Sequence, residues 1–469
     1  MNRQSIVNYT IGPVASMLLG IVSIPLITWY FPAEAIAANA LMMTLVVLLS
    51  TVMTLGLEVY YLRHYEQENP DKLLFFCGFI SLVFLTMVMS CFYALAPSTI
   101  SAWLFGQHNL VIEWLIVACF YAATTIKFLL CILRMNERSF EYSLSQGVNK
   151  GLYVGLIITA IVVGKTDEQW LVICTLVAKF FTLAYLFWIV GKRTSQRIQY
   201  YFSSTKLRDA LAFSIPLMIN GVAMWALSSI DRFMLNSLAN SFELALYSVA
   251  FNFATAAAIV QAVFATVWAP HIFKMIKGNN HVVEEYQRVL RHILHIVIAL
   301  ASLYGLTSWI LTWILPQSYS AVQNILVSCA LVPLITALAG ITTVAIQVTK
   351  KTSKIAACAA VSLIVNIMLN QWLIPDYGAV GAALGSGAAV AVYFVSMSQA
   401  AKTEGANLNL TYAYLATAIL FTMGAIVALE LVPGWVGTCV WLLPLLFVIQ
   451  QNWSLVKHGC ASLVRIYQP

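Results

Sequence analysis

The sequence LAFSIPLMINGVAMWALSSIDRFML (Leu211–Leu235), followed after a short polar link by ELALYSVAFNFATAAAIVQAVFATVWAP (Glu243–Pro270), decides the fold class. Each run is longer than the roughly 20 apolar residues that a helix needs to cross a hydrocarbon layer about 30 Å thick. A soluble helix of this length would carry a polar face, and neither run has one. We therefore predict a membrane-spanning helical hairpin with an acid and a base, Asp231 and Arg232, side by side near one end.

The composition of the whole chain agrees with this interpretation. Of the 469 residues, 61% are hydrophobic and 9% are charged, whereas a soluble domain has about a quarter charged residues. The apolar runs do not alternate with polar residues as barrel strands would, so we expect an all-α polytopic membrane protein. No small-residue cleavage site follows the first apolar run, Gly12–Trp29, and we expect this run to be retained as a span.

The apolar runs predict fourteen transmembrane helices. Their expected bounds are Asn8–Tyr30, Ala35–Tyr60, Leu73–Ala96, Leu110–Leu133, Tyr142–Gly164, Gln169–Val190, Leu211–Leu235, Glu243–Pro270, His292–Leu315, Ala321–Val348, Ile355–Ile374, Ala379–Ala400, Leu410–Leu431 and Gly434–Val456. With the amino terminus inside, 20 of the 25 Lys and Arg residues fall on the cytoplasmic side, four lie within spans, and Lys165 falls on the outer side. Because basic residues are enriched in cytoplasmic loops, this asymmetry places both termini in the cytoplasm. The basic loops can contact anionic membrane lipid, and they contain no nucleic-acid-binding module.

The longest basic loop, Gly191–Asp209, separates two sets of six spans. We predict an amino-terminal six-helix bundle over residues 1–190, a cytoplasmic basic linker over 191–209, a second six-helix bundle over 210–400, and two additional helices with a cytoplasmic tail over 401–469. The two halves echo each other weakly, because Glu34 and Glu243 are separated by the same 209 residues as Asp167 and Asp376. Such duplication is the usual construction of secondary transporters.

The sequence indicates no metal, cofactor or catalytic site. Its nine cysteines form no Cys-x-x-Cys pair, and His292 and His295 have no acidic or cysteine partner nearby. The glycine-rich run Gly381–Gly387 lies within a span, where small residues favour close helix packing rather than phosphate binding. The outer loops are short, the largest being Pro97–Asn109, and offer few groups for chemistry. We therefore expect a transporter rather than an enzyme.

Ionisable residues inside the spans mark the candidate site, since a lysine at mid-bilayer costs about 2.5–3.5 kcal/mol on insertion scales. Lys179 is about 15 Å from either end of its predicted span, which is too far to snorkel, so we expect it to face a water-filled cavity. Lys127 and Lys150 lie nearer the cytoplasmic ends of their spans, where snorkelling explains each as well as function does. No acid is expected at comparable depth, because Glu58 and Glu113 lie near span ends. If these lysines share a cavity, it is cationic and suits an anionic cargo such as a diphosphate.

Two further sets of residues are candidates for the transport cycle. Arg232 could join the cationic cavity, although its neighbour Asp231 favours a local or interhelical pair for both. Asp231 and Glu58 could form ion pairs or bind a coupling ion. Helix breakers stand at related places in the two halves and could act either as hinges or as static kinks; they are Gly12, Pro13, Pro25 and Pro216.

The order of several motifs resembles the polysaccharide transporter family. These motifs are Gly12-Pro13-x-x-Ser16, Ile24-Pro25-Leu26-Ile27, Leu55-Gly56-Leu57-Glu58, Ser214-Ile215-Pro216-Leu217, Trp225, Asp231-Arg232-Phe233, Tyr247-Ser248-Val249-Ala250 and Trp268-Ala269-Pro270. The strongest piece is Asn366 and Asn370 followed by Leu373-Ile374-Pro375-x-Tyr377-Gly378-Ala379-x-Gly381-Ala382-Ala383. It is similar to the span eleven to twelve signature of O-antigen and related lipid-linked oligosaccharide flippases, which belong to the multidrug/oligosaccharidyl-lipid/polysaccharide exporter superfamily.

This resemblance implies a function in surface polysaccharide (O-antigen-like, lipopolysaccharide) biosynthesis at the bacterial inner membrane. The cargo would be an undecaprenyl-diphosphate-linked oligosaccharide repeat unit, moved from the cytoplasmic to the periplasmic leaflet by alternating access. The family fold has two six-helix bundles forming a V around a central cavity, with two extra helices at the carboxyl end. The resemblance also implies coupling to an H⁺ or Na⁺ gradient, and a polysaccharide polymerase and a chain-length regulator as partner proteins.

Three other functions compete with this one. A multidrug exporter of the same superfamily usually places an acid in its first span, and Ile11–Trp29 has none; a cationic cavity would also repel cationic drugs. A lipid II flippase has an arginine-rich opening of the first span, which is missing here. A membrane-embedded polysaccharide polymerase or ligase would be an enzyme, and the short outer loops and tandem halves speak against it.

Overall fold

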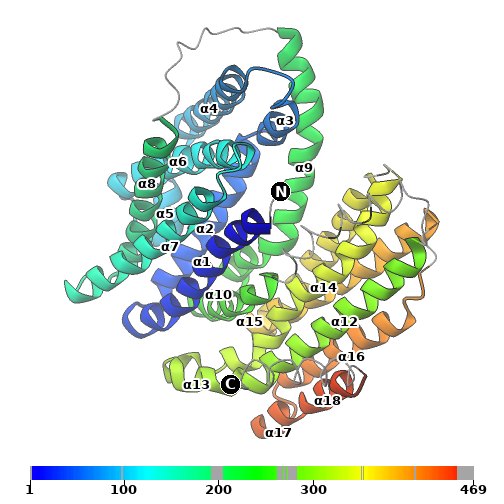
Figure 1. Ribbon diagram of the computed structural model, residues 1–469. Helices are drawn as coiled ribbons and strands as arrows, with labels where there is room; N and C mark the ends of the chain where they lie inside the picture. Colours follow the sequence, from blue (N-terminus) through cyan, green and yellow to red (C-terminus); the bar gives the residue numbers. More distant parts are fainter. Residues whose placement is uncertain are drawn as a thin grey trace, which may run out of the picture. The chain divides into compact units, whose positions relative to one another are not determined.

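The computed structural model describes residues 3–96, 99–191, 204–259, 261, 268, 272, 282–349, 351, 353–405 and 408–451. All regular structure in these residues is helical (Figure 1). Eleven of the described helices are long and apolar enough to cross a membrane. The prediction of an all-α, multi-pass membrane protein is therefore confirmed. The predicted linker 191–209, the second half of the predicted span Glu243–Pro270 and the tail after residue 451 lie largely outside the described residues.

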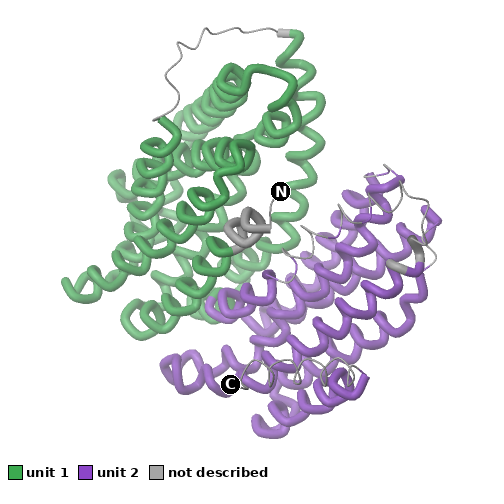
Figure 2. Tube along the Cα trace, in the orientation of Figure 1, with its two compact units in different colours: residues 1–248 green, residues 249–469 purple. Residues whose placement is uncertain are grey.

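The chain divides into two compact units, Met1–Ser248 and Val249–Pro469 (Figure 2). The helices of the first unit are α1 (Arg3–Tyr30), α2 (Ala33–Met53), α3 (Leu57–His64), α4 (Pro70–Leu95), α5 (Thr99–Phe105), α6 (Leu110–Met135), α7 (Ser139–Val162), α8 (Glu168–Gly191), α9 (Ser204–Leu238) and the first part of α10 (Ser241–Ala254). The domain limits predicted at residues 190, 209 and 400 stay predictions.

The second unit is built around one almost fully buried helix. Its helices are α12 (Val282–Thr307), α13 (Leu311–Ile314), α14 (Val322–Val348), α15 (Ser353–Thr403), α16 (Thr411–Ala428), α17 (Gly434–Cys439) and α18 (Leu442–Gln451), with 3-10 turns at Thr255–Ala257, Ser308–Ile310 and Gln317–Tyr319. Of the 18 most apolar consecutive residues of α14, 89% are buried. It packs against α12, α15 and α16, and this contact forms the core of the unit.

Helix α15 is a hairpin of two antiparallel arms that meet at a sharp bend. Gly378 breaks the helical geometry with φ 52° and ψ −125°. Near the bend, a Cβ added to Gly385 would lie 2.2 Å from the amide oxygen of Asn370. At the open end, Lys354 Nζ donates to Thr403 Oγ1 at 2.8 Å. Residues 354 and 403 would be far apart in one straight helix, so the arms coincide with the predicted spans Ile355–Ile374 and Ala379–Ala400.

Ion pairs join the two arms at the open end of this hairpin. Lys351 and Lys354 contact the two carboxylate oxygens of Glu404 at 3.0 and 2.5 Å. The hydrogen bonds from Lys354 and Lys351 hold the pKa of the Glu404 carboxyl below its usual value. The carboxylate is therefore ionised at neutral pH and joins the start of one arm to the end of the other.

A valine at position 385 should destabilise the second unit. The substitution Gly385→Val places its Cβ against the buried amide of Asn370, and overpacking of this kind costs about 1–3 kcal/mol. We expect an apparent Tm in detergent that is lower by several degrees. The matched control is Gly434→Val, because a Cβ at Gly434 meets open space. An equal Tm for the two variants would contradict the hairpin.

The loops of the first unit gather at two opposite ends. At one end, Tyr65 donates to Asn136 at 2.8 Å and Arg138 Nη1 donates to the carbonyl of Ile189 at 3.4 Å. We call this the basic end, because it carries Arg63, Lys72, Arg134, Arg138, Lys206 and Arg208. At the other end, Asn109 donates to Gln169 at 3.4 Å. The contacts agree with the alternation of inner and outer loops that the sequence predicts.

Glu113 holds the short helix α5 at the end opposite the basic end. Its side chain is buried and accepts hydrogen bonds from Tyr93 Oη at 2.5 Å and from the backbone N–H groups of Ser101 at 2.6 Å and Ile100 at 3.3 Å. A carboxylate is favoured there because N–H groups are free in the first turn of a helix. The longest predicted outer loop, Pro97–Asn109, therefore contains a helix that a span residue fixes.

Candidate functional site

Lys150 and Lys179 lie at the midpoints of two adjacent helices of the first unit. Lys150 is 11 residues from Ser139 and 12 from Val162 on α7, and Lys179 has the same position within α8. At 1.5 Å per residue, each lysine is roughly 17 Å from either helix end. Lys150 was expected nearer the cytoplasmic end of its span, whereas in the structure α7 begins three residues before that predicted span and the lysine lies at the middle of the helix. Its depth in the membrane stays a prediction.

Helices α7 and α8 run antiparallel in a register that brings the two lysines to one level. On one side of them, Asn149 Nδ2 donates to Thr182 Oγ1 at 2.9 Å. On the other side, Asn39 of α2 joins Tyr153 of α7 to Thr175 of α8 by hydrogen bonds to both. Lys150 and Lys179 lie between these two sets of hydrogen bonds, at one level of the two helices. The structure therefore brings two of the predicted cavity lysines together.

The surroundings of Lys150 come from three further helices and hold the side chain in place. A Cβ added to Gly20 of α1 would lie 3.3 Å from Lys150 Cε, so the glycine leaves room for the lysine stem. The ammonium group lies 4.7 Å from the ring centre of Tyr153, within the range of a cation–π contact. Asn39 of α2 donates to Tyr153 Oη at 3.4 Å and accepts from Thr175 Oγ1 at 2.7 Å.

Sequence reasoning missed this polar network. Asn39, Tyr153 and Thr175 are uncharged and stand singly in apolar runs. One signal was available, because Tyr153 follows Lys150 by three residues and Thr175 precedes Lys179 by four, so each lies on the same helix face as a lysine. The helix faces that carry the two lysines are therefore polar in the middle of their predicted spans.

The lysine pair has positive charge without a neutralising acid. Within the described residues, no carboxylate lies within ion-pair distance of Lys150 or Lys179, and both residues are half-buried. Two like charges held at one depth in a low-dielectric region are costly unless water or an anion is present. This arrangement can attract a phosphate group more strongly than a single lysine could.

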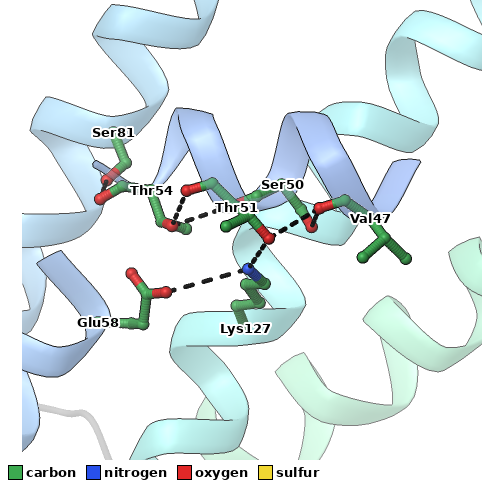
Figure 3. Close-up of polar contacts among 7 residues, drawn as sticks. All are labelled: Val47, Ser50, Thr51, Thr54, Glu58, Ser81 and Lys127. Atoms are coloured by element: carbon green, nitrogen blue, oxygen red, sulfur yellow. Dashed lines mark hydrogen bonds and ion pairs between the residues drawn. The ribbon is translucent and has the colours of Figure 1, made fainter. Parts of the chain in front are cut away.

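Lys127 has an acidic neighbour, which the sequence analysis did not expect. Its ammonium group lies 3.9 Å from Glu58 Oε1 and donates to Thr51 Oγ1 at 3.1 Å (Figure 3). The prediction that no acid lies at the depth of the lysines is wrong for this residue. The physical reason is a break in the predicted span Ala35–Tyr60, where Leu55 and Gly56 have positive φ angles of 53° and 73°. The chain restarts there as α3 and directs Glu58 toward α6 (Figure 3).

A double-mutant cycle should detect this pair. We expect Glu58→Gln and Lys127→Met each to lower the apparent Tm, because each leaves its partner half-buried and unpaired. The double variant should recover part of the loss. Since the side chains of Lys127 and Glu58 remain 31% and 20% exposed, we expect a coupling of about 1 kcal/mol rather than that of a fully buried pair. Strictly additive losses would show that the contact contributes nothing.

The remaining predicted site residues lie elsewhere in the first unit. Asp231 is buried on α9 and accepts a hydrogen bond from Tyr247 Oη of α10 at 2.9 Å. Arg232 is half-buried beside it, near the end of α9 that is farthest from the basic end. Its contribution to a cavity shared with the lysines stays a prediction, as does ion coupling by Asp231 or Glu58.

The predicted hinge residues are inside continuous helices. Pro13 and Pro25 belong to α1, and Pro216 belongs to α9. Gly12 has a further role, because a Cβ at this position would lie 2.5 Å from the backbone of Ser143 on α7. Helices α1 and α7 therefore approach each other closely at one end of the lysine site and run parallel from there to Gly20 and Lys150.

Comparisons with known proteins agree with this fold. Residues 3–276 match the family described as "Polysaccharide biosynthesis protein". The chain is similar in structure to a lipid II flippase MurJ in an inward closed conformation, with a TM-score of 0.70, 14% identity, and coverage of 96% of this chain and 100% of that one. It is also similar to an inward-facing multidrug resistance MATE transporter of the MOP superfamily, with a TM-score of 0.60, 14% identity, and coverage of 86% and 99%. No curated protein matches the sequence.

These matches identify a fold rather than a cargo. At 14% identity, similarity to a flippase and to a multidrug exporter shows a transporter-like architecture that both kinds of protein use. The family resemblance inferred from the motifs is confirmed by the match over residues 3–276. The cargo has to be argued from the residues of the site.

Proposed function

The chain belongs to the polysaccharide biosynthesis protein family, and from this premise we propose that it is a flippase for a polyprenyl-diphosphate-linked oligosaccharide. It moves the repeat unit from the cytoplasmic to the periplasmic leaflet of a bacterial inner membrane by alternating access. The diphosphate is the part of the cargo that crosses the hydrocarbon at the highest cost, because an ion loses its hydration there. A flippase must therefore offer compensating charge at mid-depth.

The observation that carries the proposal is the pair formed by Lys150 and Lys179. Both lie at helix midpoints, on facing positions of α7 and α8, with no described carboxylate as partner. A diphosphate brings two phosphoryl groups to one place, and two ammonium groups at one level can each contact one of them. A cationic drug would be repelled at this position, which favours the flippase over the multidrug exporter.

We also propose the fourteen-span topology with both termini in the cytoplasm. Eleven helices satisfy the length and hydropathy of a span, and α15 contributes two spans because it is a hairpin. Helix α7 is long enough to cross, but polar residues such as Gln146, Asn149 and Lys150 lower its hydropathy, and α10 begins the predicted span Glu243–Pro270. The V-shaped arrangement, H⁺ or Na⁺ coupling, and partnership with a polymerase and a chain-length regulator stay predictions.

Reconstitution tests the function directly. Purified protein in proteoliposomes should move a polyprenyl-diphosphate-linked oligosaccharide between leaflets, scored by access of an added glycosidase, and protein-free vesicles should not. In cells, loss of the gene should remove surface polysaccharide and accumulate the lipid-linked precursor. A strain that still adds single repeat units would indicate a polymerase instead. Sensitivity to cationic drugs with intact surface glycan would indicate an exporter.

A further inference from the structure

A second potential binding site lies at the basic end of the first unit, away from the lysine pair. It is a pocket of about 580 Å³ formed where the end of α3 meets the start of α9. Its lining includes Tyr60, Arg63, His64, Glu68, Asp209 and Phe213. None of these residues takes part in the site described above, and the volume is within the range of small-molecule sites.

One wall of the pocket is aromatic. The ring centres of Tyr60 and His64 are 4.1 Å apart and nearly parallel, at 29°. Phe213 lies edge-on to both, with ring centres 6.0 Å from Tyr60 and 6.3 Å from His64. Tyr60 is buried, whereas His64 and Phe213 remain half-buried. Arg63 covers one face of Phe213 and Tyr60 stacks on one face of His64. The part of these two rings that stays exposed suits a flat apolar surface, such as the C–H face of a pyranose ring.

The other walls are polar, and their charges cancel. Arg63 lies 4.5 Å over the ring of Phe213, and Lys206 is paired with Glu68. Asp209 is exposed at the rim and provides the second acid beside these two bases. The pocket therefore carries donors and carboxylate acceptors with no net charge when His64 is neutral. That balance suits a polyhydroxylated neutral ligand better than a diphosphate, which would require excess positive charge.

We propose that this pocket binds a sugar ring of the oligosaccharide cargo before translocation. The inference rests on the proposed function, and it separates two recognition tasks within one unit. The lysine pair recognises the diphosphate, and the pocket recognises the glycan. The pocket lies at the basic end of the unit, and Lys179 is roughly 18 Å along the axis of α8 from its end at Gly191. The two sites therefore lie at different levels of the unit, and an extended repeat unit of several sugars is long enough to span such a difference in level.

A binding measurement with lipid-free ligands tests the pocket separately from transport. The probe is the repeat-unit oligosaccharide released by mild acid from the lipid-linked precursor, and the second probe is inorganic pyrophosphate. We expect the oligosaccharide to bind the full-length purified protein in saturation-transfer NMR. Phe213→Ala should weaken that binding roughly tenfold, because the stacking surface is lost. Asp209→Asn, an exposed change with little risk to folding, should weaken it severalfold.

Matched controls define the outcomes. Phe140→Ala removes an exposed phenylalanine at the same end of the unit that does not line the pocket, and it should leave oligosaccharide binding unchanged. Pyrophosphate should bind equally to wild type and to the Phe213 and Asp209 variants. Loss of pyrophosphate binding in those variants, or oligosaccharide binding that is insensitive to both, would overturn the glycan pocket. Transport that depends on Lys150 and Lys179 without any oligosaccharide binding would overturn the pocket and leave the flippase standing.

Discussion

Replacement of both Lys150 and Lys179 by Ala should reduce flipping in proteoliposomes by at least about 100-fold. A hydrogen bond between charged groups contributes about 1.5–3 kcal/mol, and each tenfold change in rate or affinity corresponds to about 1.4 kcal/mol. Two such contacts with one diphosphate therefore account for a factor of about 100 or more. Each single variant should lose roughly tenfold or more, and surface polysaccharide in a complemented strain should fall accordingly.

The double variant should be as stable as the wild type, so a loss of transport can be distinguished from a loss of folding. A lysine at mid-bilayer costs about 2.5–3.5 kcal/mol on insertion scales, so its removal should leave the apparent Tm unchanged or raise it. Loss of transport with an undiminished Tm then identifies a functional role. Lys179→Arg should retain a large part of the activity because it keeps the charge. The control Lys165→Ala, outside the predicted spans, should transport normally; full activity of the double variant would refute the diphosphate site.

The coarse fold could be predicted because the bilayer imposes strong rules on sequence. Span length, the scarcity of charge and the asymmetry of Lys and Arg are each set by the solvent rather than by detailed packing. The hairpin of α15 illustrates this, since its two arms, which meet at Gly378, coincide with two predicted spans. The short helices α3 and α5 were not predicted, because a few residues carry too little periodicity.

The site could be predicted only in part, because its geometry depends on register. Lys179 was singled out from its depth in the predicted span alone, and its role stays a prediction. Lys150 was predicted nearer a helix end than the structure shows, because α7 begins three residues before the predicted span. The contact between Lys127 and Glu58 follows from the break after α2, which hydropathy does not reveal. Tyr153 and Thr175 became visible as partners of Asn39 only when three helices were packed together.

Two substitutions at neighbouring positions in α1 should separate close packing from hinge motion. Gly12→Val places a side chain against the backbone of Ser143, where a Cβ would already lie 2.5 Å from the α-carbon. A backbone atom cannot yield as a flexible side chain does, so α1 must move away from α7. We expect a loss of about 3 kcal/mol or more, above the range of ordinary overpacking, and an apparent Tm lower by roughly 5–10 °C.

The Gly12→Val variant should also flip its cargo more slowly, because α1 packs against Lys150 through Gly20. Pro13→Ala tests the other interpretation. Pro13 is exposed, and alanine restores a backbone N–H inside the helix, so the Tm should hold or rise. If bending at this proline is part of alternating access, the rate of flipping should drop severalfold despite the retained stability. An unchanged rate for Pro13→Ala would show a static kink, and Gly12 would then act through helix contact alone.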